Sequence, residues 1–146
     1  MATPYQVIFE SFESKIEDHD LARMTIEDRL ADEISYMNEA ITYLIMGGLV
    51  LDADLSKKED KQLEFEDDLS VPEIEILAMY MVGAWHSRRV NSLAHTSLFV
   101  GSSGEKWDQQ KSHWETSRDM RDYWFNEARF LYTNWHTHNN AYLEDE

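Results

Sequence analysis

The apolar stretch that follows Ser70 constrains the fold most strongly, because it predicts a helix with no polar face. Ser70 is a favourable N-cap, Glu73 completes a capping box, and Pro72 falls in the first turn, where no amide donor is missed. In the helix that follows, the run of apolar residues from Ile74 to Trp85 is interrupted only by Glu75 and Gly83. A helix that is apolar all round lies either in a membrane or in a protein interior. Since a membrane span needs about 20 apolar residues, we expect burial.

A long amphipathic helix is expected before it, over residues 23–46. Its apolar residues recur at steps of three and four, which is the helical period: Ile26, Leu30, Ile34, Met37, Ile41 and Leu44. Thr25 is a possible N-cap, and the pair Gly47–Gly48 is a stop signal. We expect the two helices to form the core through Ile34, Met37, Ile41, Ile74, Leu77, Met81 and Trp85.

Helix breakers are few, since the chain has only two prolines and five glycines. We therefore predict an all-α fold, a small bundle of about four helices with a long acidic loop between the second and third. The loop is expected to pack onto the bundle, and part of it to form either a short hairpin or an extension. The expected segments are a short helix within 4–17, the loop 49–69, a central helix 71–96, a last helix 105–137 with a break near 112, and a tail 138–146. The predicted organisation is thus one helical domain, 1–137, and a C-terminal tail.

The charge is strongly negative and unevenly distributed. The chain has 13 basic and 29 acidic side chains, a formal net charge of −16. Residues 1–70 hold 6 basic and 18 acidic side chains (−12), and residues 71–146 hold 7 and 11 (−4). Such a field repels phosphate backbones, so we expect no direct binding of nucleic acid. The N-terminus shows no signal-peptide pattern, and no apolar run is long enough for a membrane span.

No residue pattern predicts catalysis, a metal or a cofactor. The run Asp52-x-Asp54-x-Ser56 resembles the start of a calcium loop, but Lys57 and Leu63 occupy positions that need glycine and glutamate. No histidine follows a glutamate by three residues, which excludes the di-iron bundle pattern. There is no cysteine. We therefore expect a non-enzyme; an enzyme that uses the C-terminal histidines is the alternative that a metal-content assay would test.

Surplus aromatic residues and an arginine pair indicate interfaces. Ten of the 18 aromatic residues lie between Phe99 and Tyr142, more than a small bundle needs for its core, and aromatic residues are common interface anchors. We expect contacts between subunits at Arg88, Arg89, Trp107 and Trp114. For the two arginines a second role is open, since they could offset the negative end of the helix dipole.

The order of these features resembles that of the head–tail adaptor (connector, head-completion) proteins of long-tailed bacteriophages. The resemblance covers roughly residues 23–100 and is looser beyond them. It consists of an amphipathic helix with Met37, Ala40, Ile41 and Leu44, then Asp52 to Ser56, Phe65 to Asp68, Leu69 to Leu77, and Met81 to Trp85. After residue 104 the chain departs from the family pattern, because it is unusually rich in tryptophan and histidine.

The resemblance implies a structural virion protein of the phage neck, assembled in the host cytoplasm. Its partners would be further copies of itself in a ring, usually of twelve, then the portal protein above and a neck or tail-terminator protein below. Packaged DNA would pass through the ring without specific binding, and no membrane would be involved. The family commonly grips the portal with its C-terminal segment, here Trp135, Tyr142 and Leu143; the loop 49–69 is the other candidate. The alternative is a different helical interaction module, regulatory or chaperone-like.

Overall fold

The computed structural model describes residues 2–16, 22–99 and 104–144, with side chains described in these ranges except at 93–99, 104–110 and 136–144. The described part is mostly helical, as predicted. Its helices are α1 (Tyr5–Glu13), α3 (Ile26–Met46), α4 (Val71–Phe99) and α5 (Gly104–Glu144). Three two-residue strands accompany them: β1 (Thr3–Pro4), β2 (Lys58–Glu59) and β3 (Glu64–Phe65).

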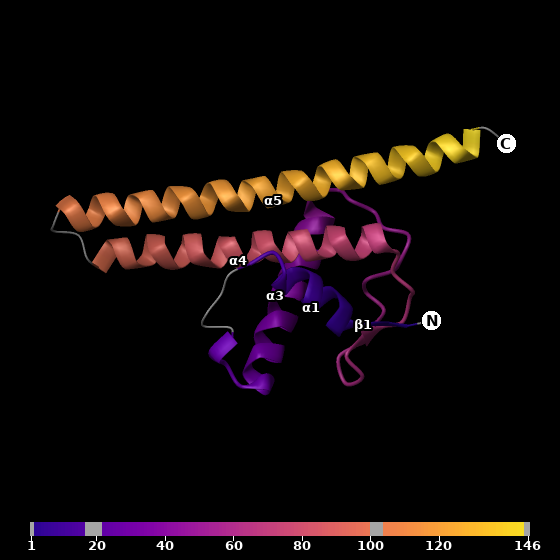
Figure 1. Cartoon of the computed structure of the whole chain (residues 1–146), viewed down its shortest axis with the longest axis horizontal. Helices are drawn as coiled ribbons and strands as arrows, with labels where there is room; N and C mark the ends of the chain where they lie inside the picture. Colours follow the sequence, from indigo (N-terminus) through magenta and orange to yellow (C-terminus); the bar gives the residue numbers. More distant parts are fainter. Residues whose placement is uncertain (1, 17–21, 100–103, 145–146) are drawn as a thin grey trace.

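Helix α4 is the central element. Helices α4 and α5 lie side by side and run in opposite directions (Figure 1). Helix α1 packs on the side of α4 away from α5, and α3 crosses α4 so that its C-terminal end reaches α5 (Figure 1). The predicted burial of the apolar helix is confirmed, because neighbours cover α4 on nearly every side. Its buried apolar residues are Ile76, Leu77, Ala78, Tyr80, Met81, Val82, Ala84, Trp85 and Val90.

All of the predicted core residues are buried or pack against the core, and the exposed end of the α3 stripe follows from how α3 crosses α4. Among the predicted core residues, Met37, Leu77, Met81 and Trp85 are buried, whereas Ile34, Ile41 and Ile74 are partly buried and pack against the core. Ile26, which belongs to the same predicted stripe, is 86% exposed. Helix α3 runs across α4 and not along it (Figure 1). The stripe is covered from Leu30 to Leu44, and Ile26 at its N-terminal end lies beyond the contact.

Both predicted helix starts are capped, but at the start of α4 the accepting side chain is that of Glu73 and not that of Ser70. Thr25 Oγ1 accepts a hydrogen bond from the Asp28 amide at 3.2 Å, as expected for an N-cap. At the start of α4, Glu73 Oε1 accepts bonds from both the Ser70 amide (3.1 Å) and the Ser70 hydroxyl (2.9 Å). Its other oxygen accepts the Ala53 amide at 2.9 Å. The buried Glu73 therefore caps α4 and also ties the acidic loop to it.

The all-α prediction is wrong in one respect, a small antiparallel sheet in the order β1-β3-β2. The predicted hairpin in the loop is present as β2 and β3, and the N-terminal strand β1 pairs with β3. Thr3 Oγ1 donates to the Asp67 carbonyl at 3.1 Å and accepts the Leu69 amide at 2.8 Å. Extended backbone against the core needs such partners, so the sheet fixes both the N-terminus and the loop.

Helix α5 is longer than predicted and continuous. The break predicted near residue 112 is wrong, and the helix passes residue 137 without interruption to Glu144. With 41 residues against 29 in α4, it is about 60 Å long against about 44 Å at 1.5 Å per residue. Its C-terminal end consequently extends past the start of α4 (Figure 1). None of the helices in the described ranges has the length and apolar character that a membrane crossing requires.

Candidate functional site: the Arg89 pocket and the helix ends around it

The two arginines expected at a subunit interface have different environments. Arg88 binds within the chain: its Nη2 lies 2.7 Å from Glu39 Oε1, it also bonds the Ser35 hydroxyl, and its guanidinium lies 4.2 Å from the Tyr36 ring centroid. Arg88 therefore joins α4 to α3. The proposed dipole role does not fit either arginine, because α4 continues to Phe99 and the dipole acts only within the last turn.

Arg89 is exposed, and the described part of the chain provides no carboxylate partner for its guanidinium. Its guanidinium lies 4.7 Å from the Trp85 ring centroid, a cation–π contact that orders the side chain. Within the described ranges, no Asp or Glu oxygen lies within ion-pair distance of Arg89. Arg89 is thus a positioned cation that the described part of the chain does not neutralise.

Arg89 borders a half-open pocket of about 310 Å³ between the end of α1, α4 and α5. We call this the Arg89 pocket. None of the lining residues in the described part of the chain is acidic. Its polar lining consists of Lys15, His86, Arg89, His113, Thr116, Ser117 and Trp124, and its apolar lining of Ile16, Trp85 and Met120.

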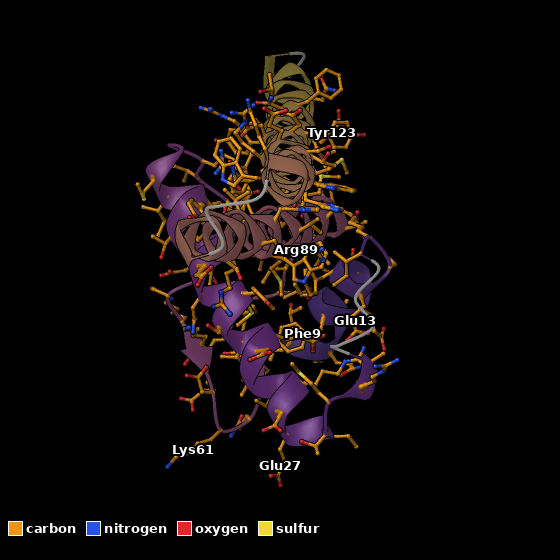
Figure 2. The ribbon with its side chains drawn as sticks, turned by 90° about the vertical axis from the view of Figure 1, so that its left-hand side faces the viewer. Phe9, Glu13, Glu27, Lys61, Arg89 and Tyr123 are labelled. Atoms are coloured by element: carbon orange, nitrogen blue, oxygen red, sulfur yellow. The ribbon has the colours of Figure 1, made fainter. Side chains whose placement is uncertain are left out.

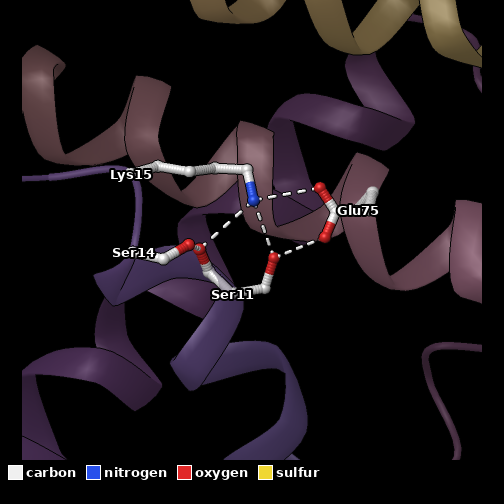
Figure 3. Close-up of polar contacts among 4 residues, drawn as sticks. All are labelled: Ser11, Ser14, Lys15 and Glu75. Atoms are coloured by element: carbon white, nitrogen blue, oxygen red, sulfur yellow. Dashed lines mark hydrogen bonds and ion pairs between the residues drawn. The ribbon is translucent and has the colours of Figure 1, made fainter.

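A hydrogen-bonded cluster beneath the pocket fixes Lys15 (Figure 3). Lys15 Nζ lies 2.9 Å from Glu75 Oε2 and donates to Ser11 Oγ at 2.8 Å. Ser11 Oγ donates in turn to Glu75 Oε1 at 2.7 Å. Burial raises the pKa of Glu75, but the bonds from Ser11 and Lys15 outweigh it and hold the pKa below its usual value. Glu75 is therefore ionised and joins α1 to α4.

The back wall of the pocket holds two buried polar atoms, His86 Nδ1 and Trp124 Nε1. Neither has a hydrogen-bond partner within the described part of the chain. Burial, together with the charge of Arg89, lowers the pKa of His86 to about 4. His86 is consequently neutral at pH 7. Because Lys15 is paired with Glu75, the uncompensated positive charge among the described lining residues is that of Arg89.

The other expected site residues are dispersed. Trp114 is partly buried, with the Arg118 guanidinium 4.7 Å from its ring centroid. Trp135, expected at the portal, packs partly against the core with its ring centroid 6.1 Å from that of Tyr132. The side chains of Trp107, Tyr142 and Leu143 lie outside the described residues.

Sequence reasoning missed an exposed apolar surface at the end of α3. Ile45, Met46 and Val50 are between 66% and 76% exposed. Beside them an open hollow of about 500 Å³ is lined mainly by aliphatic side chains of α3 and of residues 48–56. The run Leu49-Val50-Leu51 after the glycine pair was the available signal, since apolar residues in a loop indicate contacts.

The end of α3 is also fastened to α5. The Val50 amide donates to the Tyr132 hydroxyl at 3.3 Å, and Arg129 donates to the Gly47 carbonyl at 3.4 Å. These bonds join residues 82 positions apart in the sequence. Helix α5 is therefore held to the body both through α4 and through the end of α3.

In the described ranges no group of three or more His, Asp or Glu side chains is arranged to hold a metal ion. No protein-family model matches the chain, and no curated protein or solved structure matches it.

Proposed function

We propose that this chain is a structural protein of a phage neck. In this role several copies form a ring beneath the portal, extend the DNA channel and dock the next neck or tail component. The order of sequence features over residues 23–100 motivates the proposal. The observation that carries it is the architecture of α5, a long helix fastened to the body whose C-terminal end extends beyond it (Figure 1).

The C-terminal end of α5, which extends past the start of α4, suits a role in docking (Figure 1). Its expected anchors Tyr142 and Leu143 belong to the helical stretch beyond the start of α4. A helix that is already fixed loses little conformational entropy when it enters a groove on a partner. The end of α5 would then contact the portal, while the body supplies the wall of the ring.

The charge distribution suits a wall of a DNA channel. The half of the chain that forms α1, α3 and the small sheet carries −12 of the −16 charges. Such a surface repels the phosphate backbone, so that DNA slides past without being held.

Co-sedimentation with the portal protein from the same source tests the proposal. The full chain should sediment with portal oligomers. A chain truncated after residue 137 should keep its fold, with a thermal midpoint close to that of the full chain, but should stay in the supernatant. Failure of the full chain to bind the portal at any ratio would contradict the proposal. Binding by the truncated chain would move the contact to the loop 49–69.

A further inference from the structure

The Arg89 pocket presents one arginine that no described carboxylate pairs with, on a strongly acidic chain. Arg89 is ordered by its contact with Trp85, and Lys15 is fixed by Ser11 and Glu75. Thr116 and Ser117 also line the pocket, and none of the described lining residues is acidic. An arginine guanidinium matches a carboxylate in both geometry and charge. The pocket therefore favours a carboxylate as its occupant.

We propose that the Arg89 pocket receives an aspartate or glutamate side chain from a second copy of the chain. This rests on the ring assembly in the proposed function, and it adds the place at which neighbouring copies meet. A volume of about 310 Å³ with one open side admits such a side chain from outside. Inside the pocket, Arg89 provides the charge, and His113 and Thr116 flank the entering group.

The chain itself supplies a complementary surface. Exposed acidic residues are spread over α3 and the loop that follows it: Glu27, Asp52, Glu59, Glu66 and Asp68. Only Lys15 and Ile16 of the pocket lining belong to that acidic half of the chain. Attraction between the acidic half of one copy and the pocket of the next offsets the repulsion expected between two chains of −16 each.

The geometry of this contact is heterologous, because the two surfaces differ. Figure 2 shows Arg89 beside the α4–α5 layer and Glu27 at the far end of α3. Each copy can therefore give an acidic residue to one neighbour and take one from the other. Head-to-tail contacts of this kind produce a closed ring when the rotation between copies closes.

Site-specific photo-crosslinking tests the contact. The photoreactive residue p-benzoylphenylalanine is placed at position 113, where the exposed His113 forms the pocket wall. The protein is irradiated alone and with portal oligomers, separated on a denaturing gel, and the crosslinked peptides are identified by mass spectrometry. The same chain is prepared with Arg89→Glu and, as a matched control, with Arg121→Glu, whose partner Asp122 lies 3.1 Å away on the same helix.

The expected product is a crosslinked dimer whose second peptide comes from the acidic half of the chain. Its yield should fall by about tenfold in Arg89→Glu, since reversing the charge removes attraction and adds repulsion, and should persist in Arg121→Glu. Replacing the acidic residue of that peptide with lysine should restore the yield of crosslinked dimer in the Arg89→Glu chain.

Three results would overturn the inference. In the first, the crosslink joins position 113 to its own chain. In the second, rings form but Arg89→Glu assembles and crosslinks like the unchanged protein; the pocket is then not the contact, and the proposed function stands. In the third, copies never associate, alone or on the portal. This result would contradict both the proposed ring and the proposed contact at the Arg89 pocket.

Discussion

The Phe125 ring of α5 lies where a side chain on Gly83 of α4 would be. A Cβ built on Gly83 would come within 2.1 Å of the Phe125 ring. The same ring lies 5.1 Å from Tyr43 and 5.3 Å from Tyr80 between centroids. Gly83, which interrupts the apolar run of α4, thus leaves room for the Phe125 ring of α5.

Gly83→Ala should destabilise the protein by about 1–3 kcal/mol, because overpacking at this contact exceeds the gain in helix propensity. Urea unfolding followed by circular dichroism measures the change. In Gly83→Ala/Phe125→Ala the clash is removed, so the two substitutions together should cost less than the sum of their separate effects. Additive effects would show that the residues do not touch.

Leu77→Ala should cost about 2–5 kcal/mol, since Leu77 is fully buried in the N-terminal part of α4. Ile26→Ala is the matched control, because Ile26 is 86% exposed and surface changes usually stay within about 0.5 kcal/mol. Equal losses in the two variants, measured by urea unfolding, would place Leu77 outside the core.

A buried carboxyl group should make stability depend on pH. Burial, and then the hydrogen bond and charge of Glu13, raise the pKa of Glu33 from 4.5 to about 8, although Arg29 opposes the rise. The folded state therefore prefers protonated Glu33. This contribution is complete below pH 4.5 and is lost as the pH rises towards about 8.

Glu33→Gln should remove this dependence, because the amide is uncharged at every pH. Relative to the unchanged protein, the free energy of unfolding of Glu33→Gln should rise between pH 5 and pH 8.5. Glu27→Gln, at an exposed position on the same helix, serves as the control and should show no such trend. A constant difference for Glu33→Gln across this range would mean that Glu33 is ionised throughout.

The sequence predicted features that depend on local order and missed those that depend on crossing geometry. The capped starts at Thr25 and Ser70 and the burial of α4 follow from neighbouring residues alone. The exposure of Ile26 does not, since it depends on where α3 leaves the surface of α4. Nor does the continuity of α5, in which a break was expected near residue 112.

The candidate site was likewise predictable only where it depends on neighbouring residues. Arg88 and Arg89 are adjacent in the sequence, and both were expected to face a neighbouring copy. Successive residues on a helix point about 100° apart, so Arg88 meets Glu39 on α3 while Arg89 turns to the pocket. The pocket itself needs Lys15, about 70 residues away, and no local pattern reveals that meeting. The pairing of Thr3 with the loop is likewise non-local.

The acidic surface should keep the protein off DNA. Purified protein should not retard duplex DNA on a native gel even at low salt, where attraction to phosphate is strongest. Truncation after residue 137 removes three acidic and no basic side chains, which changes the net charge from −16 to −13. The truncated chain should therefore also fail to retard DNA. Tight, salt-sensitive binding by either protein would exclude a passive channel wall.

Electron microscopy of the chain mixed with portal oligomers from the same source tests the central proposal most directly. Side views should show one additional layer coaxial with the portal channel, and end views should show a closed ring with an open centre. Single copies bound at scattered positions, or portal oligomers without added density at saturating protein, would contradict a ring-forming neck protein.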